Sequence, residues 1–280
     1  MKHIVCFSGG ESSAVVALEV VEKYGKENVI LINHDIHPSS ELADVKRFKA
    51  EISDYLGVPI TYANHPEWDT KDQFDVCVDA KSFVSPQNRT ILCTHRLKTH
   101  PFYEWLKHNY EEGDIIYYGF DKSEPHRVTR RAVILGKDGY ESDYPLAVWK
   151  DRTFFKTMDV GIEPPLQYAQ FNHANCIGCL KAGWQHWYVI YCMYPEVWEK
   201  AKRTEETIKY SVHRDFYFVD KEPMFKAMQA AGVEPTEKVK SGQFWSSARK
   251  AIAGNQINLF DLPVEEATVE CMGDCGIDRN

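Results

Sequence analysis

The sequence predicts an α/β protein built on a parallel sheet, and two observations in its first half support this. Short apolar runs, beginning with Ile4–Phe7, alternate with segments whose apolar residues recur at helical spacing. The first runs each lead into a glycine pair or an acidic residue, at Gly9 and Asp35. Strands that alternate with helices pair in parallel through right-handed crossovers. Beyond Asp151 the alternation fades, which predicts a smaller, mainly helical region after the sheet.

The elements follow in order along the chain. Strands are expected at 4–7, 28–33, 58–62 and 114–120, and the first helix over 14–24. A second helix should begin at a cap, Ser39 or Ser40, and end at Gly57. Its apolar face comprises Leu42, Val45, Phe48, Ile52, Tyr55 and Leu56. Pro101 begins another helix, and helical tracts lie around 184–201, 222–231 and 244–252.

Composition limits the class of protein. With 280 residues, of which 44% are hydrophobic, the chain can bury a substantial core, and Pro164-Pro165 divides it into domains 1–165 and 166–280. A net charge of −8 argues against non-specific coating of nucleic acid or anionic membrane. No apolar run approaches the ~20 residues of a membrane span, and no export leader is apparent. We therefore expect a cytoplasmic protein whose eight cysteines serve metal or redox chemistry.

The segment between the first strand and the first helix predicts a phosphate site. It reads Ser8-Gly9-Gly10-Glu11-Ser12-Ser13. Glycines let backbone N–H groups approach an anion, and the helix start adds unpaired donors and the positive end of its dipole. A simple tight turn is the alternative. The pattern is neither that of Walker-type loops nor the dinucleotide fingerprint.

This loop resembles the PP-loop, S-G-G-x-D-S, of the ATP pyrophosphatase and phosphoadenosine phosphosulfate (PAPS) reductase superfamily. Ser8, Gly9, Gly10 and Ser13 match, and Ser12 stands where that family mostly has Asp. The resemblance implies a Rossmann-like parallel sheet with helices on both faces, of the adenine nucleotide alpha hydrolase type. It also implies that the loop binds ATP with Mg²⁺, while Ser12 puts cleavage in question.

The cysteines suggest a metal site. Cys176-Ile177-Gly178-Cys179 is a C-x-x-C on a turn, a spacing that lets two thiolates reach one metal. Cys93 lies in Cys93-Thr94-His95-Arg96-Leu97-Lys98, which resembles the segment of PAPS-reductase-like enzymes that contributes to a [4Fe–4S] cluster. The resemblance carries over Cys93, Cys176 and Cys179 as ligands, and Leu92 replaces a fourth. The alternatives are a structural zinc site that adds Cys271 and Cys275, or Cys271 or Cys275 as the fourth ligand of the cluster.

Further residues are singled out by place or resemblance. Asp35 and Gly119 follow strands whose carboxyl ends share one edge, where such sheets bind ligands. Arg127, with Arg130 and Arg131 close by, is a candidate anion site, as is Lys98. Cys275 lies in Asp274-Cys275-Gly276-Ile277, similar to the tail that carries the nucleophile of sulfonucleotide reductases. A merely terminal segment is the alternative. Cys6, Cys77 and Cys192 are interpreted as packing residues.

The leading hypothesis is an enzyme that cleaves ATP between the α- and β-phosphates, adenylates a substrate and supports sulfur transfer through the cluster. One alternative is a PAPS or adenylylsulfate reductase that uses Cys275 to make sulfite. The candidate catalytic residues are Cys275, Lys98 and Arg127. Another is a nucleotide-binding partner protein of a nucleic-acid modification or defence complex, with a degenerate loop. The expected partners are an adenine nucleotide and a sulfur donor or thiol reductant. A nucleic-acid substrate and a homodimer stay open.

Overall fold

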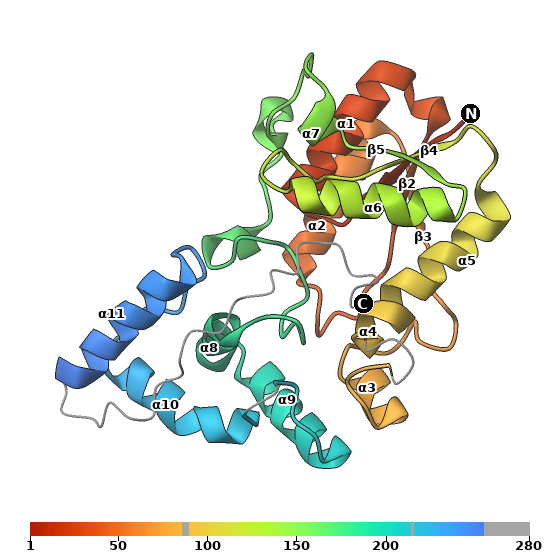
Figure 1. The fold of residues 1–280 in the computed structure, drawn as a ribbon. Helices are drawn as coiled ribbons and strands as arrows, with labels where there is room; N and C mark the ends of the chain where they lie inside the picture. The colour runs from red at the N-terminus through yellow and green to blue at the C-terminus, as the bar shows by residue number, and fades with distance from the viewer. Residues whose placement is uncertain (86–89, 214–215, 255–280) are drawn as a thin grey trace. The chain divides into compact units, whose positions relative to one another are not determined.

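The computed structural model describes residues 1–85, 90–213 and 216–254. Within them lies one five-stranded, all-parallel sheet in the order β3-β2-β1-β4-β5 (Figure 1). Its strands are β1 (His3–Cys6), β2 (Val29–Asn33), β3 (Ile60–Tyr62), β4 (Ile115–Tyr117) and β5 (Glu141–Asp143). The predicted α/β class with a parallel sheet is confirmed. Strand β5 was not predicted, because its polar sequence Glu-Ser-Asp lacks the apolar signal of a buried strand.

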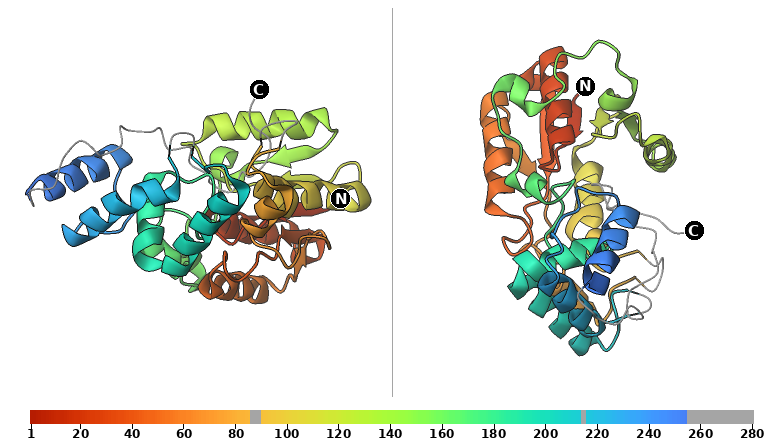
Figure 2. Two further views of the ribbon diagram at one scale, coloured as in Figure 1. Left: turned by 90° about the horizontal axis from the view of Figure 1, so that it is seen from below. Right: turned by 90° about the vertical axis from the view of Figure 1, so that its left-hand side faces the viewer.

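Helices cover both faces of the sheet, and the side-chain alternation of the central strands explains this. Val5 and Tyr117 pack with α1 (Glu11–Tyr24), α2 (Ala43–Leu56) and α7 (Pro145–Val148). Ile4 and Ile116 pack on the other face with α5 (His100–Asn109) and α6 (Pro125–Lys137). The right-hand view of Figure 2 shows α1 and α2 on the side of the strands opposite α6. Such two-faced burial is typical of parallel sheets.

The second helix begins later than its predicted cap. The N-cap of α2 is Leu42, and no side chain caps it. The prediction that Ser39 or Ser40 caps this helix is therefore wrong, because both hydroxyls donate instead to Asp72 and Gln73. Tyr55, expected on the apolar face, is exposed.

The chain forms two compact units. The first comprises 1–36, 41–69 and 97–167, and contains the sheet. The second comprises the described residues within 37–40, 70–96 and 168–254. Its helices are α3 (Asp75–Ala80), α4 (Leu92–Thr94), α8 (Trp184–Met193), α9 (Pro195–Ile208), α10 (Phe218–Ala230) and α11 (Ser241–Gly254). The shorter helical segments of the chain are η1 (Lys26–Asn28), η2 (His95–Thr99), η3 (Thr157–Val160) and η4 (Leu166–Ala169).

Large aromatic side chains make the core of the second unit. The ring centres of Trp187 and Trp198 lie 6.4 Å apart, and both rings contact the fully buried Phe218. Rings of this size bury much apolar area per residue, which suits a unit whose described residues form no sheet. None of the described helices combines the length and the apolar character needed to cross a membrane.

Candidate functional site

The loop after β1 has the backbone geometry of a phosphate cradle. Gly9 has φ +82°, a left-handed conformation that favours glycine, and Gly10 is the N-cap of α1. The Ser13 hydroxyl donates to Gly10 O at 2.8 Å and accepts from Ser8 N–H at 3.1 Å, which closes the loop on itself. The N-cap Gly10 makes no side-chain cap hydrogen bond, and the start of a helix directs backbone N–H groups and the positive end of its dipole toward an anion.

At two positions of this site, neighbouring groups lie so close to the backbone that only glycine fits without a shift. A Cβ on Gly9 would lie 3.0–3.1 Å from the Lys49 stem and Val45. A Cβ on Gly119 would lie 2.9 Å from the backbone of Ser12 and Ser13. The structure thus brings Gly119, at the end of β4, against the first turn of α1. The strand order reverses direction between β1 and β4, and ligands of such sheets bind in the crevice at this point.

Asp35 and Lys98 lie near the carboxyl end of β2. Asp35 is paired with Lys46 at 2.6 Å, and two hydrogen bonds join its backbone to the Asn64 side chain beyond β3. Burial lowers the pKa of His34 to about 4, and positive charge on Lys98 and Lys49 contributes. The His34 ring is therefore neutral at pH 7, and Lys98 and Lys49 lie close enough to it to affect its pKa.

A buried ion pair beside this loop was missed by the sequence analysis. Lys49 is 1% exposed and its ammonium group lies 2.7 Å from Glu41. Burial lowers the pKa of Lys49, and the charge of Glu41 opposes that shift. The signal was present in the sequence, because Lys49 lies between Val45 and Ile52 on the apolar face of the helix.

The predicted anion site at Arg127 is partly occupied by protein groups. Arg127 forms an ion pair with Glu124, and its guanidinium group lies 4.1 Å from the centre of the Phe120 ring. One guanidinium nitrogen, Nη2, is buried and has no hydrogen-bond partner. Arg127 therefore keeps one donor for a ligand, and Glu124 neutralises much of its charge.

The three predicted metal-binding cysteines belong to the second unit. The side chains of Cys93, Cys176 and Cys179 are each half-buried. Helix α3 contacts both cysteine segments: Phe74, its N-cap, lies 3.3 Å from a Cβ built on Gly178, and Cys93 N–H donates to Cys77. Cys271 and Cys275, the other predicted ligand and nucleophile positions, lie outside the described residues.

The other cysteines that the structure describes behave as packing residues. Burial raises the pKa of Cys6 and of Cys77 to about 12 in each case. Burial also raises the pKa of Cys192. Thiols in this state remain protonated at neutral pH and are poor nucleophiles.

A second polar cluster, also missed, joins three distant residues of the second unit. Glu237 lies 3.1 Å from His173 Nε2 and 3.1 Å from His186 Nδ1. Burial lowers the pKa of His186, so this ring is neutral at pH 7. Burial alone would raise the pKa of Glu237, but hydrogen bonds from the two imidazoles lower it to about 2. The shift of Glu237 fits an ionised carboxylate that accepts a hydrogen bond from each ring.

The hydrogen bonds of this cluster do not suit a metal. His173 Nδ1 accepts Asn175 N–H at 3.3 Å, which places the ring proton on Nε2, facing Glu237. A metal would need that Nε2 lone pair. Histidines that bind metals also donate their other N–H to an acceptor, whereas His186 Nε2 is buried with no hydrogen-bond partner. We therefore interpret the cluster as a hydrogen-bonded triad.

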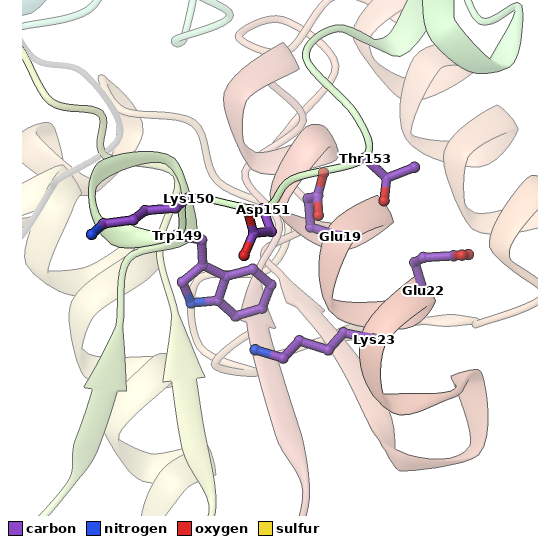
Figure 3. A pocket seen from close by; sticks show the side chains of 7 residues that line it. All are labelled: Glu19, Glu22, Lys23, Trp149, Lys150, Asp151 and Thr153. Atoms are coloured by element: carbon purple, nitrogen blue, oxygen red, sulfur yellow. The ribbon is translucent and has the colours of Figure 1, made fainter.

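A hollow of about 470 Å³ lies in the first unit, away from the predicted site residues (Figure 3). Its lining includes Glu19 and Lys23 of the C-terminal half of α1, roughly 12 Å along the helix from Glu11 at 1.5 Å per residue. These groups are already engaged, because Glu19 accepts Phe154 N–H and Lys23 lies 4.0 Å from the centre of the Trp149 ring. We therefore assign no ligand to this hollow.

Comparisons of the chain with protein-family models, with curated proteins and with solved structures gave no match. The functional interpretation consequently rests on the residues and their geometry.

Proposed function

We propose that this protein is a PP-loop enzyme that binds ATP at the Ser8–Ser13 loop, cleaves it between the α- and β-phosphates and adenylates a substrate. The observation that carries the proposal is the loop itself: a left-handed Gly9, the start of α1 at Gly10 and a backbone-to-backbone approach of Gly119, all at the strand-order reversal. Backbone donors fixed there would stabilise negative charge that develops on the departing pyrophosphate.

The residues at this edge fit the cofactors of such a reaction. Glu11, Asp35 and the serines offer hard oxygen donors of the kind that Mg²⁺ prefers. Bound Mg²⁺ would neutralise charge on the transferred phosphates. Lys98 adds positive charge near His34, which favours a polyanion.

The cysteines support the second part of the proposal, in which an iron–sulfur cluster serves sulfur transfer. Cys93, Cys176 and Cys179 are thiolate donors of the second unit, and α3 contacts the segments that carry them. Soft sulfur ligands suit an iron–sulfur cluster, and zinc is the alternative. When bound with one iron lacking a protein thiolate, such a cluster supplies a site for an added sulfur.

Product analysis tests this proposal. Full-length protein is incubated anaerobically with Mg²⁺, ATP labelled in the α-phosphate, and bulk tRNA or duplex DNA. We expect AMP and pyrophosphate, and the same products from a Cys275→Ser variant. Sulfite formed from PAPS and a thiol reductant, without AMP from ATP and abolished by Cys275→Ser, would contradict the proposal and support the reductase alternative.

A further inference from the structure

One buried amide side chain holds the C-x-x-C turn. Gln73 Nε2 donates to the carbonyl oxygens of Ile177, at 2.8 Å, and Gly178, at 3.2 Å. Gln73 Oε1 accepts the Ser40 hydroxyl, and Ser40 O accepts Ile177 N–H at 2.8 Å. Gln73 and Ser40 are 2% and 1% exposed. Four hydrogen bonds thus form a closed circuit among three segments of the second unit.

The adjacent residue, Asp72, fixes the main chain that carries Gln73. Asp72 is buried and accepts N–H groups from Phe74 and Asp75 at the start of α3. Its carboxylate also accepts from Lys200, at 2.6 Å, and from Ser39, at 2.7 Å. Burial alone would raise the pKa of Asp72, but these hydrogen bonds lower it, so the carboxylate is ionised at neutral pH.

Packing restricts the turn from another side. Gly178 has φ +70°, and a Cβ there would lie 2.6 Å from Val197 Cγ1. In a trans peptide the carbonyl oxygen and the following N–H point in opposite directions. Because Gln73 holds the carbonyls of Ile177 and Gly178, the N–H groups of Gly178 and Cys179 point away from Gln73.

We propose that Gln73, oriented by Ser40, is a positioning residue that directs these two N–H groups toward the sulfur atoms of a metal centre bound through Cys176 and Cys179. This inference rests on the proposed function, which assigns those cysteines as ligands. Donors to metal-bound sulfur stabilise its negative charge, and partners beyond the ligands commonly change metal affinity 10- to 100-fold. The amide therefore acts on the metal centre through the peptide groups of the turn.

The chain offers a matched control for this residue. Gln185 of α8 is also buried in the second unit, and its Nε2 donates to Thr236 O at 2.9 Å and Val239 O at 3.1 Å. Gln73→Leu and Gln185→Leu each remove two amide-to-carbonyl hydrogen bonds. Only Gln73 bonds to the cysteine turn, so a general loss of stability affects both variants and a positioning effect affects one.

Titration of the reduced, metal-free, full-length protein with Co²⁺ under anaerobic conditions tests the inference through thiolate-to-cobalt absorption. We expect Gln73→Leu to weaken Co²⁺ binding about 10- to 100-fold, and Gln185→Leu to change it by less than about twofold. Ser40→Ala, which keeps the amide but frees its orientation, should weaken binding by a smaller factor. Thermal unfolding of each variant reports the shared loss of stability.

The outcomes separate the two proposals. Thiolate binding of Co²⁺ by the wild type, with equal affinity in Gln73→Leu and Gln185→Leu, overturns the positioning role alone. A wild type that shows no thiolate-to-cobalt absorption overturns the cysteine assignment of the proposed function and the positioning role with it. If Gln73→Leu does not fold, unchanged Co²⁺ affinity in Ser40→Ala overturns the inference.

Discussion

The phosphate loop of the first unit and the cysteine turn of the second are built in different ways. The hydrogen bonds within the loop are local: Ser8, Gly10 and Ser13 lie within six residues and hydrogen-bond among themselves. The turn is held from far away, by Gln73 and Ser40, more than a hundred residues earlier in the chain. A local site depends on backbone conformation, whereas an assembled site depends on buried polar contacts that distant residues supply.

The largest effect should come from the buried ion pair of Lys49 and Glu41 beside the phosphate loop. Lys49→Met leaves Glu41 buried without its partner, which should cost about 3–5 kcal/mol of unfolding free energy. The double variant Lys49→Met/Glu41→Leu should recover most of that loss. Denaturant unfolding of the two variants measures both. Equal stability of Lys49→Met and wild type would show that the ion pair contributes nothing to the stability of the loop region.

A substitution at Gly119 tests whether the phosphate loop depends on the close packing of its backbone. Gly119→Ala places a methyl group 2.9 Å from the backbone of Ser12 and Ser13, which should cost about 1–3 kcal/mol and abolish nucleotide binding. Gly136→Ala is the control, because a Cβ there meets nothing within 4 Å and lies inside α6. It should stabilise the protein by up to about 1 kcal/mol. Binding of an ATP analogue by Gly119→Ala at wild-type affinity would contradict the assigned site.

In the second unit, the pH dependence of stability tests the hydrogen-bonded triad around Glu237. Its pKa is lowered to about 2 in the folded protein and is near 4.5 when unfolded, so it stabilises the fold above pH 4.5 and loses this effect as pH falls toward 2. By pH 3 the loss should be about 2 kcal/mol. Glu237→Gln should remove this part of the acid dependence in denaturant unfolding. An unchanged acid profile would argue against the hydrogen-bonded triad.

Glu205 gives the opposite and smaller pH dependence. Burial raises its pKa to about 7, although the N–H groups of Phe218 and Val212 favour the charged form. The folded state therefore holds a proton that the unfolded state has released, and stability falls as pH rises from 4.5 to 7. Between pH 6 and 8 the loss should be about 1.4 kcal/mol. Glu205→Gln should flatten this decline, and a decline of equal slope in the variant would assign it to another group.

The same contrast explains how much the sequence could predict. The parallel sheet and the loop geometry follow from local patterns, because an apolar run, two glycines and a helical repeat specify them within about twenty residues. Strand β5 was not predicted because its three residues are polar. The Gln73 circuit and the Glu237 triad could not be predicted, because nothing local in the sequence indicates which distant carbonyl or imidazole a buried side chain will meet. Lys49 is an intermediate case, because its position on an apolar helix face predicts that it is buried but does not identify Glu41 as its ion-pair partner.

The most direct test of the central claim is the location of nucleotide binding. Amide hydrogen exchange of the full-length protein is compared with and without Mg²⁺ and α,β-methylene-ATP, an analogue that resists cleavage between the α- and β-phosphates. We expect protection concentrated in residues 8–14 and around Gly119. Protection confined to the hollow beside Trp149, or no protection at a saturating concentration of the analogue, would contradict the assignment of a phosphate site to this loop.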